Sequence, residues 1–171
     1  FSGLTWDYKK KREVGISFWT SVSDYMQDWK DVYEIPTLEL MVDKIGMNNL
    51  RDLSEKVESL DCWDGLEHVT ERKVEIYKEN CYLKWRYQEH PTNHYHVVKF
   101  SYRCWAVYHI YQDEVNITEM HHGENETDIR MILDYMIDFA VRNHLKKVTT
   151  WSPVNTEEHA ILEFYGFRNQ S

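Results

Sequence analysis

The second half of the chain shows the clearest pattern of hydrophobic and polar positions. His96–Phe100, Tyr102–Tyr111 and Val115–His121 are rich in β-branched and aromatic residues, which favour strands. Residues 112–114, Gln-Asp-Glu, are typical of a tight turn. We therefore predict an antiparallel meander of three strands.

A long amphipathic helix should follow this meander. Hydrophobic residues recur there at spacings of three and one, which places them on one face of an α-helix: Ile129, Ile132, Leu133, Met136, Ile137, Ala140 and Val141. Asn125 or Thr127 can cap its first turn. Residues 147–151 then predict a strand, and residues 156–165 predict a short helix that Gly166 ends.

The first half of the chain has a weaker pattern. Pro36 can open a helix that runs through Ile45 and closes at Gly46. Residues 49–60 place four aliphatic side chains at helical spacing, which predicts a second helix. Residues 75–85 predict a third, which ends before Pro91.

The order of these elements predicts the fold class. A strand, a helix and a strand in succession form a β-α-β unit, whose right-handed crossover makes the two strands parallel. We expect an α/β (α+β) domain with a mixed sheet, mostly antiparallel with one parallel pair, flanked by helices. Its 171 residues fit one domain, assigned to residues 49–171, with residues 1–48 as an N-terminal segment.

Composition narrows the classes of partner. The net charge is −9, whereas proteins that bind nucleic acid or an anionic membrane unaided are usually basic, so we expect neither partner. The three cysteines include no CxxC pair, which favours a reduced, cytoplasmic location. No apolar run approaches the roughly 20 residues of a membrane span, and the charged start lacks the apolar stretch of a signal peptide.

Three segments carry motifs of one known family. Residues 115–151 have the order strand, long helix, strand. Asn155 is followed eleven residues later by Gly166-Phe167, in NTEEHAILEFYGF. Residues 82–98 read YLKWRYQEHPTNHYHVV. Together these segments resemble the GNAT superfamily of acyl-CoA-dependent N-acyltransferases, nearest its bacterial members with a WRY…HP signature.

The resemblance implies a place for the cofactor, acetyl-CoA or another acyl-CoA. In the family the two parallel strands splay apart, the pantetheine pairs with the first of them, and the pyrophosphate sits on the start of the next helix. Carried to this chain, the cofactor-binding residues are Met120, Gly123, Asn125 and Asn155.

The sequence also departs from the family pattern. The glycines of the pyrophosphate loop are missing, and Glu124, Glu126 and Asp128 surround the helix start. Carboxylates suit the N-terminus of an unliganded helix but repel a phosphate. A tyrosine that often acts as general acid in the family is replaced by Leu162. These departures favour an alternative, a catalytically degenerate domain that serves as a binding or assembly module or as half of a tandem transferase.

Acylation of an amine needs a base near the end of the first parallel strand. Glu119 and His121 are two residues apart, so they share one face of a strand, with Met120 and His122 on the other. We expect Glu119 or His121 to be the catalytic base and assign no metal ligand. The pair could instead form a metal fragment with His109, or a polar sheet end without function. A metal-binding or hydrolytic protein is a third reading, which rests only on the nine histidines.

The leading hypothesis is therefore transfer of an acyl group from acyl-CoA to a small amine, such as an amino sugar. Family members normally add a strand after Gly-Phe, whereas here only four residues follow Phe167. Residues 1–30 resemble that closing-strand region. We predict that the N-terminal segment supplies the strand, either within one chain or between the two chains of a homodimer.

Overall fold

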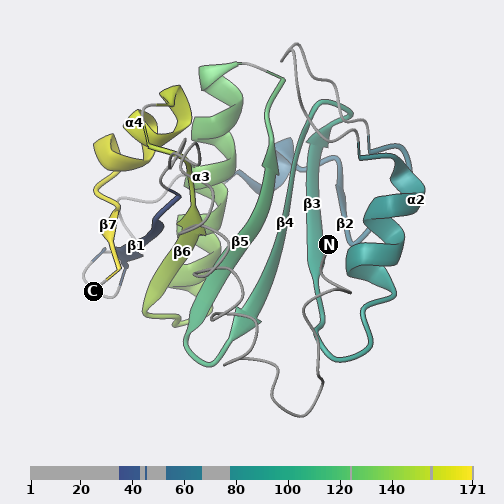
Figure 1. Cartoon of the computed structure of the whole chain (residues 1–171), viewed down its shortest axis with the longest axis horizontal. Helices are drawn as coiled ribbons and strands as arrows, with labels where there is room; N and C mark the ends of the chain where they lie inside the picture. Colours follow the sequence, from purple (N-terminus) through teal and green to yellow (C-terminus); the bar gives the residue numbers. More distant parts are fainter. Residues whose placement is uncertain are drawn as a thin grey trace, which may run out of the picture. The chain divides into compact units, whose positions relative to one another are not determined.

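The computed structural model describes residues 35–42, 45, 53–66, 78–123, 125–154 and 156–170. Its centre is a seven-stranded sheet in the order β2-β3-β4-β5-β6-β1-β7 (Figure 1). The strands are β1 Thr37–Met41, β2 Ser59–Leu60, β3 His96–Ser101, β4 Cys104–Tyr111, β5 Glu114–His121, β6 Lys147–Trp151 and β7 Arg168–Asn169. The helical elements are the 3₁₀ turn η3 Ser54–Lys56, α2 Asn80–Leu83, the π-helical turn η4 Lys84–Gln88, α3 Glu126–Arg142 and α4 Glu157–Phe164.

The predicted fold class is confirmed. The pairs β2–β3, β3–β4, β4–β5, β1–β6 and β1–β7 are antiparallel, and β5–β6 is parallel. The predicted meander, the long helix, the strand at residues 147–151 and the short helix after it are all present. No helix within the described ranges has both the length and the apolar character to span a membrane.

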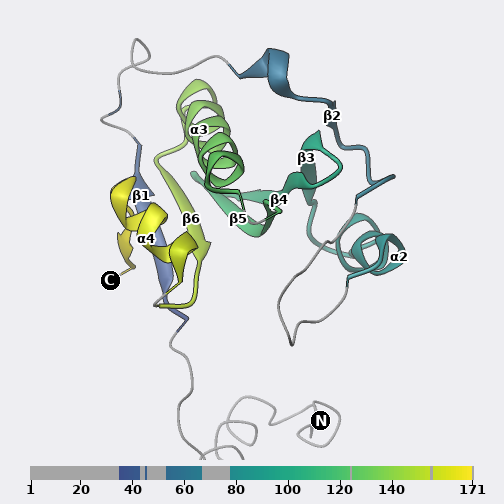
Figure 2. The same ribbon diagram turned by 90° about the horizontal axis from the view of Figure 1, so that it is seen from above.

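Apolar clusters lie on both faces of the sheet. On one face, α3 and α4 cover a large apolar cluster that includes Leu38, Ile117 and Leu133. On the other face, a smaller cluster joins α2 and η4 to the side chains of β3 and β4: Trp63, Leu66, Leu83, Tyr87, Val97, Trp105 and Val107. Figure 2 shows α3 and α2 on opposite sides of the sheet. Both faces of β3 and β4 are therefore packed against apolar side chains.

A β-bulge interrupts the pairing of β4 with β5. Tyr108 lies opposite Ile117, and Val107 lies opposite Glu119, so Thr118 is one residue too many on β5. A bulge rotates the following side chains to the other face of the sheet. Ile117 therefore packs beneath α3, whereas Glu119 faces α2.

Two helix predictions in the first half are wrong. Residues 37–41 form β1 rather than part of a helix from Pro36 to Ile45. Leu38 and Leu40 are two apart, a spacing that also suits a strand, and pairing with β6 decides the outcome. Within 49–60, the described part forms the 3₁₀ turn η3 and then β2, because Leu60 pairs with Val98 at the sheet edge.

The third predicted helix is partly confirmed. It begins at Asn80 and continues as the π-helical turn η4 through Gln88, beyond the predicted end at Trp85. Gly46 and residues 75–77 lie outside the described residues.

Strand β1 comes from the N-terminal segment and lies between β6 and β7. Leu38 pairs with Thr150 on one side and with Asn169 on the other. A strand does follow Gly166-Phe167, since β7 pairs with the outer edge of β1. Residues 1–34 lie outside the described residues, so the part of residues 1–30 in closing the sheet stays a prediction.

A glycine turn brings the chain back to the sheet after α4. Gly166 has φ +96°, a left-handed conformation that glycine adopts without strain. Its N–H donates to the Glu163 carbonyl at 3.0 Å, and the Phe167 N–H donates to the Leu162 carbonyl at 3.1 Å. Phe167 is thereby fully buried, which explains the Gly-Phe pair in structural terms.

The first prediction tests the orientation of α3. Leu133→Ala should lower the free energy of unfolding by about 2–5 kcal/mol, because Leu133 is fully buried beneath α3. Leu60→Ala is the matched control, since Leu60 is exposed on β2 and its loss should cost about 0.5 kcal/mol or less. Urea denaturation measures both. Equal losses would contradict the assignment of this helix face.

The second prediction concerns the three thiols. Cys62 and Cys81 are exposed, whereas Cys104 is buried and its burial raises the pKa of its thiol to about 12. A disulfide-exchange reagent at mildly alkaline pH should titrate two thiols in the folded protein and three after unfolding. The Cys104→Ala variant should still titrate two thiols when folded, and it should also titrate two, rather than three, after unfolding. Immediate reaction of all three thiols would contradict the packing of β4.

Candidate functional site

The candidate site lies where β5 and β6 separate. Their parallel ladder runs from Glu114↔Lys147 to Asn116↔Thr149 and stops there. Beyond it, side chains of β6 reach the backbone of β5: Thr150 Oγ1 donates to the Ile117 carbonyl and Trp151 Nε1 donates to the Thr118 carbonyl, both at 3.2 Å.

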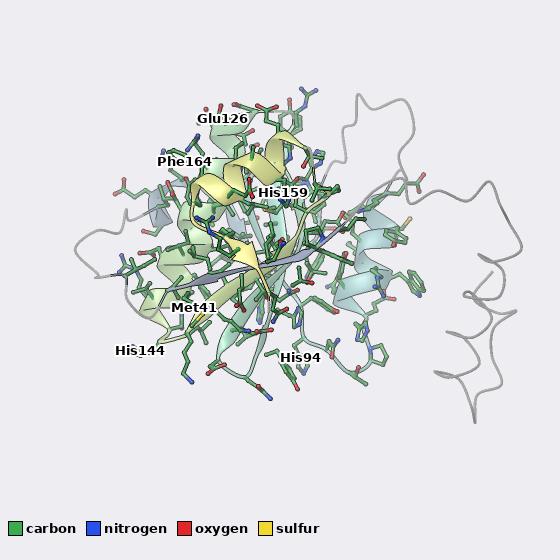
Figure 3. All side chains as sticks on the ribbon, turned by 60° about the vertical axis from the view of Figure 1, so that its left-hand side comes forward. Met41, His94, Glu126, His144, His159 and Phe164 are labelled. Carbon is green, nitrogen blue, oxygen red and sulfur yellow. The ribbon has the colours of Figure 1, made fainter. Side chains whose placement is uncertain are left out.

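Helices α3 and α4 both begin at this end of the sheet, because each follows one of the two parallel strands. Figure 3 shows Glu126 and His159 there, and His144 and His94 at the opposite end. The residues predicted to act in catalysis follow the last β5–β6 pair on β5.

Glu119 is a nearly buried carboxylate with two partners. Its side chain is 8% exposed, and its Oε1 forms an ion pair with Lys78 Nζ. The Tyr87 hydroxyl donates to Oε2 at 2.6 Å. Burying a carboxylate without partners would lower the stability of the fold by several kcal/mol, because the charge loses its contact with water. The ion pair and the hydrogen bond offset this desolvation penalty. The arrangement holds a negative charge in a sheltered position on the sheet.

Tyr87, which binds Glu119, lies in the π-helical turn η4. Turns of this kind are rare and recur at functional sites. Leu83 and Tyr87 are both buried in the smaller cluster, and the Tyr87 ring stacks on Trp63 with centroids 6.2 Å apart. Burial, and secondarily the charge of Glu119, raises the pKa of Tyr87, which keeps the phenol protonated as a donor. The WRY segment thus connects the helical layer to the candidate base.

His121 lies on the same face as Glu119, as the spacing predicts. Its ring is buried against Trp105, with centroids 5.3 Å apart. Met120 points to the opposite face, where it packs against the cluster beneath α3. The side chain of Met120 is therefore partly buried, on the face opposite Glu119.

His109 takes part in a chain of hydrogen bonds that joins β4, β5 and β6. Thr118 donates its hydroxyl hydrogen to Asn116 Oδ1 at 3.2 Å, and Asn116 Nδ2 donates to Thr149 Oγ1 at 2.9 Å. Thr118 Oγ1 must then accept from His109 Nδ1, 3.2 Å away, so the neutral ring carries its lone pair on Nε2. Burial lowers the pKa of His109, which favours that neutral form. His109 lies opposite Asn116, and Thr118 is two residues further along β5, so these side chains meet on one face of the sheet.

The start of α3 is capped by its own residues. Asn125 Oδ1 accepts from the Thr127 N–H at 3.0 Å, so this predicted cofactor residue acts as a helix cap in the structure. Arg130 pairs with Glu126, with Nε 2.9 Å from Oε1. Burial, partly offset by His122, raises the pKa of Asp128. Gly123 has φ +50° in the turn before the helix. Glu124 and Asn155 lie outside the described residues.

Histidines and a carboxylate also connect β5 to α4. His122 Nε2 lies 3.4 Å from Glu158 Oε2, and its Nδ1 is buried without a hydrogen-bond partner among the described residues. Thr156 caps α4 by accepting from the His159 N–H at 3.1 Å. The His122–Glu158 pair therefore links the end of β5 to the first turn of α4.

The metal site and the tyrosine general acid considered in the sequence analysis are not seen at the candidate site within the described residues. Within the described ranges no three histidine, cysteine or acidic side chains are grouped as metal ligands would be. His96 Nδ1 instead lies 3.1 Å from Asp61 Oδ1. Leu162 is fully buried, and the Tyr165 hydroxyl donates to Asp134 Oδ1 at 2.9 Å. Comparison with protein-family models and with curated protein sequences finds no match to this chain.

The third prediction tests the bond between Tyr87 and Glu119. Tyr87→Phe should lower the free energy of unfolding by about 1.5–3 kcal/mol, because a buried carboxylate loses a donor. Tyr95→Phe is the control, since its hydroxyl accepts an exposed hydrogen bond from Asn93 Nδ2 at 3.3 Å. In a Glu119→Gln background the cost of Tyr87→Phe should shrink, and a double-mutant cycle by urea denaturation measures the coupling. Strictly additive losses would contradict a direct bond.

Proposed function

We propose that the chain is an N-acyltransferase that transfers an acyl group from acyl-CoA to a small amine. The observation that carries the proposal is the sheltered carboxylate of Glu119, on β5 just beyond the last residue pair with β6. A β-α-β unit whose strands separate at this point also fits the GNAT resemblance, in which the acyl donor lies between the strands. An amino sugar is one acceptor that fits the hypothesis.

Glu119 would act as the base that removes a proton from the attacking ammonium. Its Oε1 already binds one alkylammonium group, that of Lys78, which supports an affinity for this chemistry. His121 and His109 lie on the same face and could pass the proton to solvent. Of these, His109 is held by Thr118, whose Oγ1 lies 3.2 Å from His109 Nδ1.

The donor would meet the backbone of residues 119–121 and the starts of α3 and α4. Pairing with Arg130 offsets the charge of Glu126, which lessens its repulsion of a pyrophosphate. Gly123 supplies a bend before the helix. Met120 would contribute its backbone, while Asn125 would have to share its capping role with a phosphate.

Two observations favour the second candidate function, a degenerate domain that serves as a binding or assembly module. The Asn125 cap uses the Thr127 N–H, and the position of the family's general acid holds the buried Leu162. A domain of this kind would keep the fold without binding or turning over acyl-CoA. The two candidate functions therefore differ in whether the protein binds and turns over acyl-CoA.

The fourth prediction separates them. Acetyl-CoA at millimolar concentration should raise the melting temperature, because a ligand that binds only the folded state stabilises it. With acetyl-CoA and a panel of amino sugars and alkylamines, CoA release followed by chromatography should show turnover. A thiol reagent is unsuitable for this assay because Cys62 and Cys81 are exposed. No thermal shift and no turnover would favour the assembly module.

Glu119→Gln should lower kcat by about 10²–10⁴-fold, the usual contribution of a general base. Glu114→Gln is the matched control, since Glu114 lies at the other end of β5 and pairs with Lys147. Unchanged turnover in Glu119→Gln would remove Glu119 from the mechanism.

A further inference from the structure

Lys78 places a primary amine directly on the candidate base. Its Nζ contacts Glu119 Oε1, and its side chain is only 28% exposed. The Tyr87 hydroxyl holds the other oxygen of the same carboxylate at 2.6 Å. The amine and the carboxylate are thus kept together on the face of the sheet covered by α2, away from most of the solvent.

The other lysine ion pairs of the described ranges differ in their carboxylates. Lys84 pairs with Asp64 at 2.5 Å, and Lys99 pairs with Glu58 at 3.2 Å, but both carboxylates are largely exposed. Lys147 is as sheltered as Lys78, yet it lies at the start of β6, where the β5–β6 ladder is intact. Lys78 therefore combines a sheltered carboxylate with the end of β5 where the strands separate.

We propose that Lys78 is itself an acyl acceptor, modified by the thioester that the chain binds. This inference rests on the proposed function. Glu119 takes a proton from the Lys78 ammonium, and the free amine attacks the thioester carbonyl. A C–N bond forms and the C–S bond breaks. CoA leaves as a thiolate, which gains a proton, so the products are an Nζ-acyl lysine, free CoA and one released proton.

Acylation would change the site as well as the lysine. The amide nitrogen is neutral, so the ion pair with Glu119 is lost. Glu119 keeps its bond from Tyr87 and gains an oxygen free to accept a proton from an external amine. The contact also indicates the acceptor class, because a site that holds a lysine ammonium suits amines on unbranched alkyl chains.

The fifth prediction uses mass spectrometry of the full chain after incubation with acetyl-CoA. Acetylation of Lys78 blocks tryptic cleavage after it, so residues 74–84 should appear as one peptide heavier by an acetyl group. Lys84 ends the same peptide and pairs with an exposed carboxylate, which makes it an internal control. Lys78 should react about 100-fold faster than Lys84, the scale of general-base catalysis.

Two further samples test the role of the carboxylate. Glu119→Gln should reduce acetylation of Lys78 to the rate of Lys84, whereas Glu114→Gln should leave it unchanged. Urea-unfolded wild-type protein should lose the advantage of Lys78 as well, and this sample gives a result even where Glu119→Gln does not fold.

The outcomes separate this inference from the proposed function. Acetylation of added amines with Lys78 unmodified would overturn the inference and leave the proposed function in place. Equal rates at Lys78 and Lys84, or a rate at Lys78 that survives unfolding or a folded Glu119→Gln variant, would mean simple chemical acylation and would also overturn it. Absence of both acetyl-CoA binding and any acetylation would overturn both proposals.

Discussion

One extra residue in β5 decides which face of the sheet carries the polar chemistry. Strict alternation after Ile117 would aim Glu119 into the apolar cluster beneath α3, where an unpaired carboxylate costs several kcal/mol, about the effective penalty per buried ion. The bulge at Thr118 turns Glu119 to the other face, where Lys78 and Tyr87 bind it. The candidate site therefore depends on a local break in an otherwise regular ladder.

Much of the fold could be predicted because its signals are local and repeated. The apolar face of α3 and the β-branched residues of the meander agree with their tertiary packing, so pattern and structure coincide. Residues 37–41 were different, since Leu38 and Leu40 suit either a strand or a helix. Pairing with β6 decides between the two, and a partner so distant in sequence leaves no trace in local periodicity.

The candidate site was less predictable, because its side chains are bound by residues from distant parts of the chain. The common face of Glu119 and His121 follows from their spacing, but nothing in the sequence indicates a bulge or selects Lys78 as the partner of Glu119. The role of Asn125 as a cap follows from its place before a helix, whereas its use by a cofactor depends on the resemblance alone. Charges and hydrogen bonds between distant segments are set by the tertiary structure.

The insertion of β1 between β6 and β7 has a consequence for the order of folding. During synthesis β1 leaves the ribosome long before either neighbour, so it has no partner until almost all of the described chain has been made. Contacts between such distant segments form slowly. Until they form, the edge of β6 offers unpaired backbone groups to any other extended strand, including the β1 of another nascent copy. The strand that completes the sheet is thus also where two chains could exchange segments before either has finished folding.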